Sequence, residues 1–273
     1  MTSFALALVL IAACLHAFWN LVIARSRDTQ AATALALSVG VVAALPFALL
    51  RWNVRPEAWP YIAASSALEL LYFWLLTTAY RRAELSLIYP IARGTAPVIV
   101  LVVSVGLLGV GWSPLQAAGV GLVALGVLLV RGLRGAAPTS DVALALAIAA
   151  SIASYTLVDK AGVQFADPIA YVTLILVAPA IISVLAVERR GRGRVRATVA
   201  PVTLAGGVAS IAAYGLVLAA LTVAPAASVA AIREVSVVIA TVLAAIFLHE
   251  RIEPARWLGS VVVVAGIALV VVA

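Results

Sequence analysis

Two arginines lie deep inside apolar segments of this chain of 273 residues, and their chemistry most needs an explanation. Arg93 and Arg233 each follow about eight residues of an otherwise apolar stretch. A charge at the centre of a lipid bilayer costs about 2.5–3.5 kcal/mol, so such a side chain normally faces protein or water. Either the two arginines line a cavity and bind an anionic group of a substrate, or each bonds a carboxylate or the carbonyl groups of a broken helix.

Two glutamates are available to balance these charges. Glu234 directly follows Arg233, and Glu69 lies within a separate apolar segment. Because burial favours the neutral form of a carboxyl group, Glu69 is the best candidate for coupling movement of a substrate to protons, besides contacting that substrate. A plain ion pair between Glu69 and Arg93, or between Glu69 and Arg82, explains its position equally well.

The segment around Arg93 reads Y-P-I-A-R-G-T-A-P, from Tyr89 to Pro97. Pro90 and Pro97 each remove a backbone hydrogen bond of a helix, and Gly94 loosens it further. We expect these three residues to form a hinge, or to free carbonyl groups for a ligand. A static kink is the alternative. Tyr89 is expected to contact the substrate.

Other polar and aromatic side chains inside apolar segments are candidate cavity walls. His16 and Asn20 are four residues apart and therefore share a helix face. His16 is either a proton carrier or a hydrogen-bonding residue between helices. A shift of 136 residues aligns Trp19 with Tyr155, so the two segments correspond. The expected wall residues are His16, Trp19, Asn20, Tyr72, Trp74, Tyr155 and Tyr214.

Several kinds of chemistry have no support in the sequence. The two histidines form no metal-binding spacing with the single cysteine, Cys14, which also cannot form an intramolecular disulfide. There is no G-x-x-x-x-G-K-[ST] loop, so we expect no ATP hydrolysis. We therefore expect neither a metal nor a cofactor.

The composition is that of a polytopic membrane protein. Hydrophobic residues make up 65% of the chain and charged residues only 11%, against about 25% in soluble domains. The net charge of +7 comes from short loops, which indicates membrane orientation rather than nucleic-acid binding. Since a membrane-spanning helix needs about 20 apolar residues, we expect an all-α fold of ten such helices. The expected ranges are 4–23, 31–50, 59–79, 85–108, 114–131, 141–160, 168–187, 199–219, 226–247 and 254–272.

Residues 79–130 and 219–270 repeat one pattern at an interval of 140 positions. The matching pairs are Arg93 and Arg233, Pro114 and Pro254, Gly119 and Gly259, and Gly126 and Gly266. We therefore expect two five-helix repeats, at residues 1–135 and 136–273. Because five is odd, the two repeats must have opposite orientations in the membrane.

Loop charges agree with an inverted repeat. Loops after the odd-numbered helices carry thirteen Lys and Arg residues, and loops after the even-numbered helices carry three. The charges also exchange between equivalent loops: Arg81 and Arg82 follow the third helix, whereas the loop after the eighth helix has no charge. The positive-inside rule places both termini outside the cytoplasm, with Arg51 and Arg55 as exceptions.

The chain resembles the EamA-type permeases of the drug/metabolite transporter superfamily. The segment FLHERIEPARWLGSVVVVAGIALVV is similar to the end of a family repeat, with His249 and Glu250 in place of the usual Gly-Glu. HAFWNLVIARSRD, residues 16–28, looks like the opening motif of one branch. The resemblance implies secondary transport, often export, of amino acids, metabolites or drugs, and a bacterial inner membrane. Family members used for comparison have both termini in the cytoplasm, which conflicts with the charge count.

The resulting hypothesis is a secondary transporter that exports a small polar or amphipathic metabolite, such as an amino acid or a drug-like compound, by alternating access of a central cavity. We expect the protein to interact with its small-molecule substrate and with the lipid bilayer, and not with nucleic acid. Transport is either coupled to protons or not coupled to an ion. The protein is expected to be a monomer or a homodimer. The alternatives are a membrane-embedded enzyme acting on a lipid or isoprenoid, and a channel or sensory receptor. Scattered rather than clustered intramembrane acids disfavour the enzyme.

Overall fold

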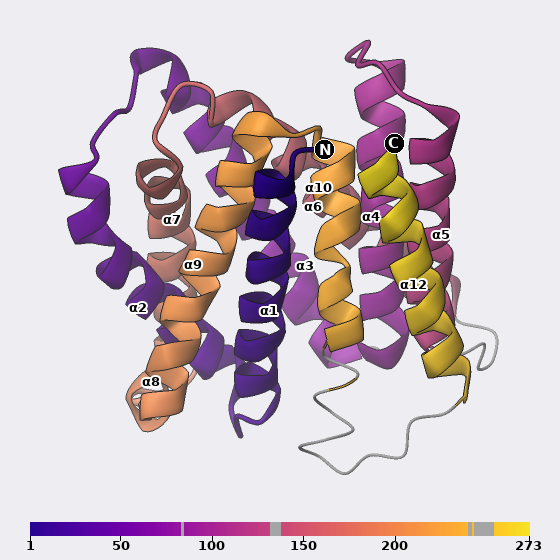
Figure 1. Cartoon of the computed structure of the whole chain (residues 1–273). Coiled ribbons are helices and arrows are strands. Elements are labelled where there is room, and N and C mark those ends of the chain that lie inside the picture. Colours follow the sequence, from indigo (N-terminus) through magenta and orange to yellow (C-terminus); the bar gives the residue numbers. More distant parts are fainter. Residues whose placement is uncertain (83–84, 132–137, 240–241, 243–253) are drawn as a thin grey trace.

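The computed structural model describes residues 1–82, 85–131, 138–239, 242 and 254–273 (Figure 1). The secondary structure of the described part is helical, joined by loops and turns, with one isolated antiparallel bridge between Val54 and Ala166. This confirms the predicted all-α class. The long helices are α1 (Ser3–Ala24), α2 (Thr29–Leu50), α3 (Trp59–Arg82), α4 (Leu85–Gly106), α5 (Pro114–Arg131), α6 (Thr139–Gly162), α7 (Pro168–Arg189), α9 (Pro201–Val223) and α12 (Pro254–Val272). The shorter elements are η1 (Pro56–Ala58), α8 (Arg194–Ala197) and α10 (Ala226–Arg233).

Capping residues fix where several helices begin. The side chains of Thr2, Asp28 and Asp167 precede α1, α2 and α7 and accept a hydrogen bond from a backbone N–H of the first turn. These groups have no partner within the helix, so an oxygen at the N-cap stabilises the first turn. Helices α7 and α9 have a proline at the first helical position, where the missing N–H costs nothing.

The expected helix 226–247 is interrupted after its eighth residue. Helix α10 ends at Arg233, and Glu234 is its C-cap. The Glu234 N–H donates to the Ala231 carbonyl at 3.1 Å, and the Val237 N–H donates to the Glu234 carbonyl at 2.9 Å. Such bonds over three residues replace the regular helical pattern. The second half thus has a helix break at the position that corresponds to the hinge predicted for α4, at a site without proline.

The last helices of the two repeats pack closely and antiparallel. A Cβ atom on Gly119 would lie 2.8 Å from the Gly266 carbonyl oxygen, and one on Gly126 would lie 2.7 Å from the Gly259 carbonyl oxygen. Lower numbers on α5 thus meet higher numbers on α12, so the helices run in opposite directions (Figure 1). The duplicated glycines therefore face each other, as expected for two halves of opposite orientation.

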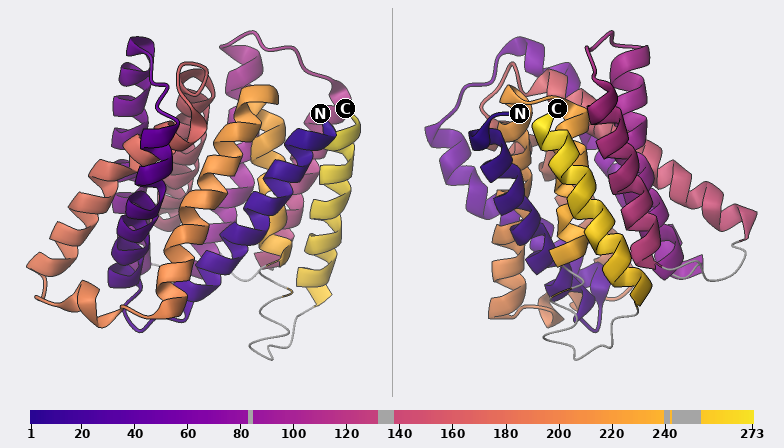
Figure 2. Two further views of the ribbon diagram at one scale, coloured as in Figure 1. Left: turned by 60° about the vertical axis from the view of Figure 1, so that its left-hand side comes forward. Right: turned by 45° about the vertical axis from the view of Figure 1, so that its right-hand side comes forward.

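The two halves interlock rather than lie side by side as separate bundles. Helix α1 packs along α9 of the second half, and α6 packs along α3 and α4 of the first half. Helix α2 packs against α7 and α9 (Figure 2). Each half thus contributes its first helix to a face of the other, and residues of both halves surround the centre of the molecule.

The outer surface of the helices is apolar. Leu50, Leu107 and Val261 are among its large exposed side chains. By length and composition, five described helices are able to cross a membrane, namely α1, α2, α6, α7 and α9. Shorter apolar helices cover 91–106, 114–129 and 257–272. Exposed tryptophans lie close to helix ends, where indole rings favour the membrane interface: Trp52, Trp59, Trp112 and Trp257.

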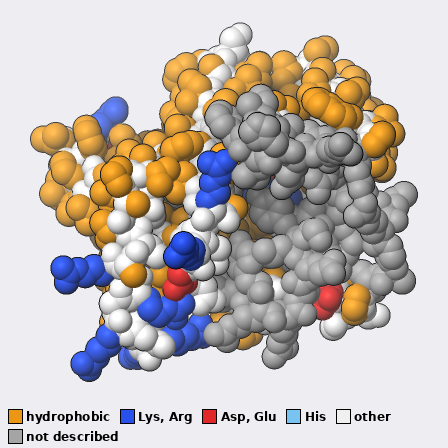
Figure 3. Space-filling view, turned by 90° about the horizontal axis from the view of Figure 1, so that it is seen from below, with side chains coloured by type: hydrophobic (Ala, Val, Ile, Leu, Met, Phe, Trp, Pro, Cys, Tyr) orange, Lys and Arg blue, Asp and Glu red, His pale blue; other side chains and the backbone are white. Residues whose placement is uncertain are grey.

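Both termini lie at one end of the molecule, which we call the terminal end, and α8 lies at the opposite, basic end (Figure 1). Lys and Arg side chains gather on part of the basic end (Figure 3). The exceptional Arg51 and Arg55 have structural partners: Arg51 pairs with Asp167 at 3.6 Å, and Arg55 donates to the Gln164 carbonyl oxygen at 2.7 Å. These bonds hold the loop after α2 against the loop after α6.

Candidate substrate cavity

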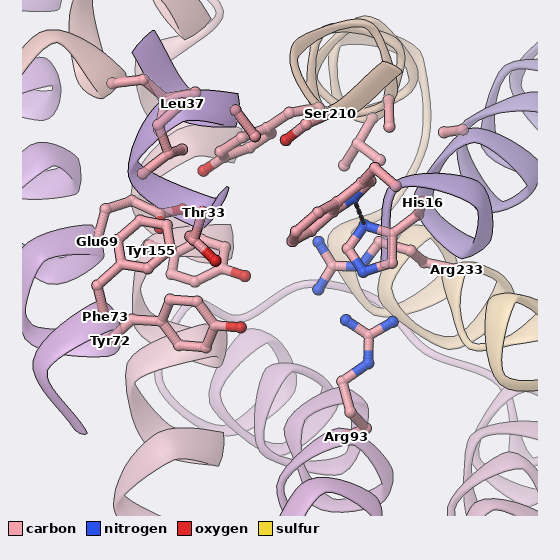
Figure 4. A pocket seen from close by; sticks show the side chains of 17 residues that line it. His16, Thr33, Leu37, Glu69, Tyr72, Phe73, Arg93, Tyr155, Ser210 and Arg233 are labelled. Atoms are coloured by element: carbon pink, nitrogen blue, oxygen red, sulfur yellow. Dashed lines mark hydrogen bonds between the residues drawn. The ribbon is translucent and has the colours of Figure 1, made fainter. Parts of the chain in front are cut away.

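A cavity of about 80 Å³ lies at the centre of the molecule, between the two halves (Figure 4). This volume is enough for several water molecules. Its walls come from eight helices, α1 to α4, α6, α7, α9 and α10. The lining residues are Ala12, His16, Trp19, Thr33, Ala36, Leu37, Glu69, Tyr72, Phe73, Arg93, Tyr155, Leu176, Ser210, Ala213, Tyr214, Val217 and Arg233.

Among the charged residues that line the cavity, Arg233 has a buried hydrogen-bonding atom without a partner. It occupies the last turn of α10, directly before the helix break, and only 7% of its surface is exposed. Its Nε atom is buried without a hydrogen-bond partner, and the guanidinium forms no ion pair with the described residues. A buried cation in this condition is costly unless an anion joins it. Arg233 is therefore suited to bind an anionic ligand.

Arg93, the repeat partner of Arg233, is held by the protein itself. Its Nε atom donates to the Glu234 carboxylate at 2.9 Å, and its second guanidinium nitrogen donates to Ser236 Oγ at 3.1 Å. Arg93 and Glu234 are both buried, with side chains 6% and 1% exposed. The pair joins α4 of the first half to the helix break of the second half. For Arg93, this contact matches the alternative in which the buried arginine bonds a carboxylate of the protein.

His16 adds a neutral hydrogen-bond donor beside the two guanidiniums. Trp19 Nε1 donates to His16 Nδ1 at 3.2 Å, and the two rings meet edge to face. Because an indole nitrogen can only donate, Nδ1 is the accepting nitrogen and the ring proton is on Nε2. In Figure 4, His16, Arg93 and Arg233 approach the cavity from one side. This donor side of the cavity favours an anionic group.

The opposite side carries a carboxyl group and three phenols. Glu69 from α3 is 4% exposed and forms no ion pair with the described residues. The ring of Tyr155 lies 6.1 Å from that of Tyr72 and 6.2 Å from that of Tyr214. Figure 4 shows Glu69, Tyr72 and Tyr155 across the cavity from the arginines. This acceptor side suits a cationic, aromatic or hydroxyl-bearing part of a ligand.

The structure brings together most of the predicted wall residues. His16, Trp19, Glu69, Tyr72, Arg93, Tyr155, Tyr214 and Arg233 line the cavity. Asn20 does not; its amide nitrogen donates to the His16 carbonyl oxygen at 2.8 Å, one turn back in α1. Trp74 is 64% exposed and lies outside the cavity. The side chain of Tyr89 lies outside the described residues.

The predicted hinge lies in a helix that is continuous over residues 85–106. Pro90 contributes its backbone to α4, but its side chain lies outside the described residues. A Cβ atom on Gly94 would lie 3.1 Å from the Ala124 carbonyl oxygen, so this glycine allows α4 to approach α5. Pro97 is buried. Bending at Pro90, Gly94 and Pro97 stays a prediction.

Some lining residues were missed by the sequence analysis. Thr33 of α2 and Ser210 of α9 are polar residues within apolar spans, and that isolation was the available signal. Thr33 donates its hydroxyl to the Thr29 carbonyl oxygen at 2.7 Å, so its oxygen retains accepting capacity. Phe73 and Leu176 carry no polar signal. Helices α2 and α7 therefore also reach the cavity.

A metal centre finds no support within the described ranges, where no group of three or more His, Cys, Asp or Glu side chains is placed to hold a metal ion. The cavity instead combines fixed donors, acceptors and aromatic rings of both halves. Such a lining can bind and orient a small molecule.

The profile of the EamA-like transporter family matches the chain twice, over residues 3–132 and 139–272. The chain belongs to this family. It is therefore a membrane transporter of the drug/metabolite type. A solved structure described as "Crystal structure of protein" has 18% sequence identity and a TM-score of 0.81, and the match covers 100% of this chain and 98% of that one. At this identity the likeness shows the fold alone. No curated protein matches the chain.

Proposed function

We propose that this EamA-like transporter exports a small amphipathic metabolite with an anionic group, such as an amino acid, by secondary transport. The observation that carries the proposal is the buried Arg233 guanidinium, which lines a central cavity, has no hydrogen-bond partner for its Nε atom and forms no ion pair with the described residues. A carboxylate of the substrate would accept charge-assisted hydrogen bonds from Arg233 and from His16 Nε2.

The acceptor side of the cavity supports a substrate with a second, different end. Glu69 attracts an ammonium group, and the faces of Tyr72 and Tyr155 contact an apolar or aromatic portion. A zwitterion such as an amino acid satisfies both sides at once. A substrate with only anionic groups would leave Glu69 opposed by like charge.

Alternating access would expose this cavity in turn to each side of the membrane. The interlocked halves have opposite orientation, so movement of one half against the other exchanges an opening at one end for an opening at the other. The break after Arg233 provides a place where the second half can bend close to the bound anion. The predicted hinge at Pro90, Gly94 and Pro97 would serve the first half.

Glu69 is proposed as a proton-coupling group as well as a contact for the substrate. A carboxyl group with 4% exposure can exchange a proton when the cavity opens to water. Replacing Glu69 by Gln keeps the shape but fixes the neutral form. We expect the E69Q variant to retain exchange of substrate against substrate and to lose acceleration by a pH gradient. Acceleration equal to that of the wild type would contradict this role.

The proposed location is a bacterial inner membrane with the basic end in the cytoplasm. In a Cys14→Ser background, one cysteine is introduced at Asn53 of the terminal end or at Ala197 of the basic end. A membrane-impermeant thiol reagent applied to spheroplasts is expected to label N53C and not A197C. The reverse pattern would place the termini in the cytoplasm.

A ligand panel tests the substrate class. Thermal unfolding of the purified protein is measured with anionic, zwitterionic and cationic metabolites of similar size. Because a bound ligand stabilises the folded state, zwitterions with an aromatic or apolar side chain should raise Tm most. Ligands that do so are then assayed for counterflow in proteoliposomes. Stabilisation by cations without a carboxylate, and by nothing else, would contradict the proposal.

A further inference from the structure

A second buried polar site lies behind the cavity wall, around Asp159 in the last turn of α6. Asp159 is fully buried, and its Oδ2 atom accepts a hydrogen bond from the Tyr214 hydroxyl at 2.6 Å. Tyr214 also lines the cavity, so this bond connects the two sites. The neighbouring Lys160 does not neutralise Asp159: its Nζ atom donates to the carbonyl oxygens of Leu221 and Ala224, at 2.6 and 3.0 Å.

Three oxygen atoms at this site are buried without hydrogen-bond partners. They are Asp159 Oδ1, Ser65 Oγ and Tyr171 Oη. Ser65 and Tyr171 are fully buried, and their hydroxyl groups lie beside the Asp159 carboxyl group, together with that of Tyr214. They come from α3, α6 and α7, so three helices place unsatisfied oxygens around one point. Buried polar atoms normally have a partner, and three orphans at one place indicate a missing one.

The packing around Tyr171 indicates that the protein is shaped to hold the phenol oxygen at this site. A Cβ atom on Gly162 would overlap the Tyr171 hydroxyl group, so only glycine at this position allows the phenol to lie against α6. Gly162 is one turn beyond Asp159 on the same helix. The close approach brings the phenol oxygen directly beside the carboxyl group. A cation at this point would have both oxygens as ligands.

Charge determines what this ligand can be. Asp159 forms no ion pair with the described residues, and an ionised carboxylate buried without a cation is strongly disfavoured. The other charged or titratable groups that face it are Tyr155 on its own helix, Glu69 on α3, Tyr171 on α7, Tyr214 on α9 and Arg233 on α10. The side-chain atoms directly beside the Asp159 carboxyl group, from Ser65, Tyr171 and Tyr214, are all oxygens, and Arg233 acts on it from a greater distance. Since hard cations prefer oxygen, and one carboxylate balances one charge, the site fits a monovalent cation.

We propose that Asp159 binds the monovalent cation that is coupled to transport, a sodium ion or a proton, with Ser65 and Tyr171 as its other oxygen partners. This inference rests on the proposed secondary transport and assigns it a coupling site beyond the cavity. Because Tyr214 contacts both Asp159 and the cavity, occupation of the site can alter the shape of the substrate site. Asp159, rather than Glu69 alone, then stores the driving ion.

The first arm of the test measures sodium binding to the purified full-length protein. Tm is recorded in sodium, potassium and choline chloride at equal ionic strength. If the ion is sodium, Tm rises saturably with sodium alone, and the Asp159→Asn variant loses the response. Ser65→Ala and Tyr171→Phe should weaken the apparent sodium affinity about tenfold, as removal of one ligand would. Asp141→Asn, a control near the other end of α6, should respond as the wild type does.

The second arm measures protonation of the buried carboxyl group by infrared spectroscopy. If the ion is a proton, sodium has no specific effect, and a protonated-carboxyl band that disappears with rising pH in the wild type is absent from D159N. Ser65→Ala and Tyr171→Phe should shift that band or its titration, which keeps the test valid if D159N does not fold. The proposal is overturned if these variants match the wild type in both arms. Neither arm uses substrate, so failure of the Arg233 anion site would leave these results unaffected.

Discussion

Arg93 and Arg233 occupy equivalent positions of the two repeats, yet their surroundings differ. Arg93 bonds Glu234 and Ser236, whereas Arg233 has no hydrogen-bond partner for Nε and no ion pair within the described chain. The repeat interval of 140 aligns Glu234 with Gly94. The first half therefore lacks the carboxylate with which the second half neutralises Arg93. This difference at one pair of equivalent positions gives Arg93 a structural partner and leaves Arg233 without an ion pair in the described chain.

This difference shows how two equivalent repeats can form one cavity with two chemically different sides. Gly94 also allows a close approach, because a Cβ atom there would lie 3.1 Å from the Ala124 carbonyl oxygen. A glutamate at residue 94 would therefore require α4 and α5 to move apart slightly. The pair between Arg93 and Glu234 then ties α4 to α10, while Arg233 lines the cavity without an ion pair to the described residues.

Removing the partner of Arg93 should have the largest effect. Glu234→Gln leaves a buried guanidinium without a counter-charge, which we expect to lower the free energy of unfolding by about 3–5 kcal/mol. Denaturant unfolding in detergent micelles measures this loss. The double variant Arg93→Met/Glu234→Leu, which removes both charges, should recover most of it. A single variant as stable as the wild type would show that the pair is not structural.

Changing the donor beside Arg233 should have a smaller effect, on binding rather than stability. Trp19→Phe removes the hydrogen bond to His16 Nδ1. The neutral imidazole ring can then carry its proton on Nδ1 instead of Nε2. We expect the affinity for a carboxylate substrate to fall by about 0.5–1.5 kcal/mol, or roughly two- to tenfold. Titration with the best ligand of the panel measures it. Trp59→Phe, an exposed indole at the start of α3, is the matched control and should bind normally.

An arginine pair at the basic end should have the smallest effect, because water reaches it. Arg194 pairs with Asp28 at 2.8 Å, and both side chains are 30% exposed. Burial tends to raise the pKa of Asp28, but the hydrogen bonds from the Ala31 N–H and Arg194 outweigh it and lower the pKa from 3.8. The stabilisation is therefore complete above pH 3.8 and is lost as pH falls through the lowered pKa.

Asp28→Asn tests this contribution by its pH dependence. The variant should be less stable than the wild type by no more than about 1 kcal/mol at neutral pH, and the difference should shrink on acidification. Thermal unfolding between neutral and acidic pH measures both. A difference that grows as the pH falls would contradict the sign of the pKa shift.

The helices could be predicted because their signals are local. Long apolar segments separated by Arg, Pro and Gly place most helices, and the duplicated glycines predict two similar halves. The sequence could not show that Gly119 meets Gly266 and Gly126 meets Gly259, because this depends on how α5 and α12 pack. It also could not predict the break after Arg233, where no proline or glycine marks the backbone.

The cavity could be predicted only in part, for a related reason. Charged and aromatic residues within apolar spans are conspicuous, so Arg93, Arg233 and Glu69 could be singled out from the sequence, and all three line the cavity. Which arginine is neutralised depends on contacts between α4 and α10, and the pairing of Arg93 with Glu234 spans 141 positions. Asp159 and Lys160 are adjacent in the sequence, but the two side chains have different partners.

The most direct test of the account is the concentration dependence of substrate flux into proteoliposomes for Arg233→Ala, with Arg27→Ala at the exposed basic end as the control. Loss of a charge-assisted hydrogen bond is worth about 1.5–3 kcal/mol, so KM should rise roughly tenfold to a hundredfold, while unfolding shows no loss of stability. If R233A transports with the KM of the wild type, Arg233 does not bind the substrate anion and the proposed cavity chemistry is wrong.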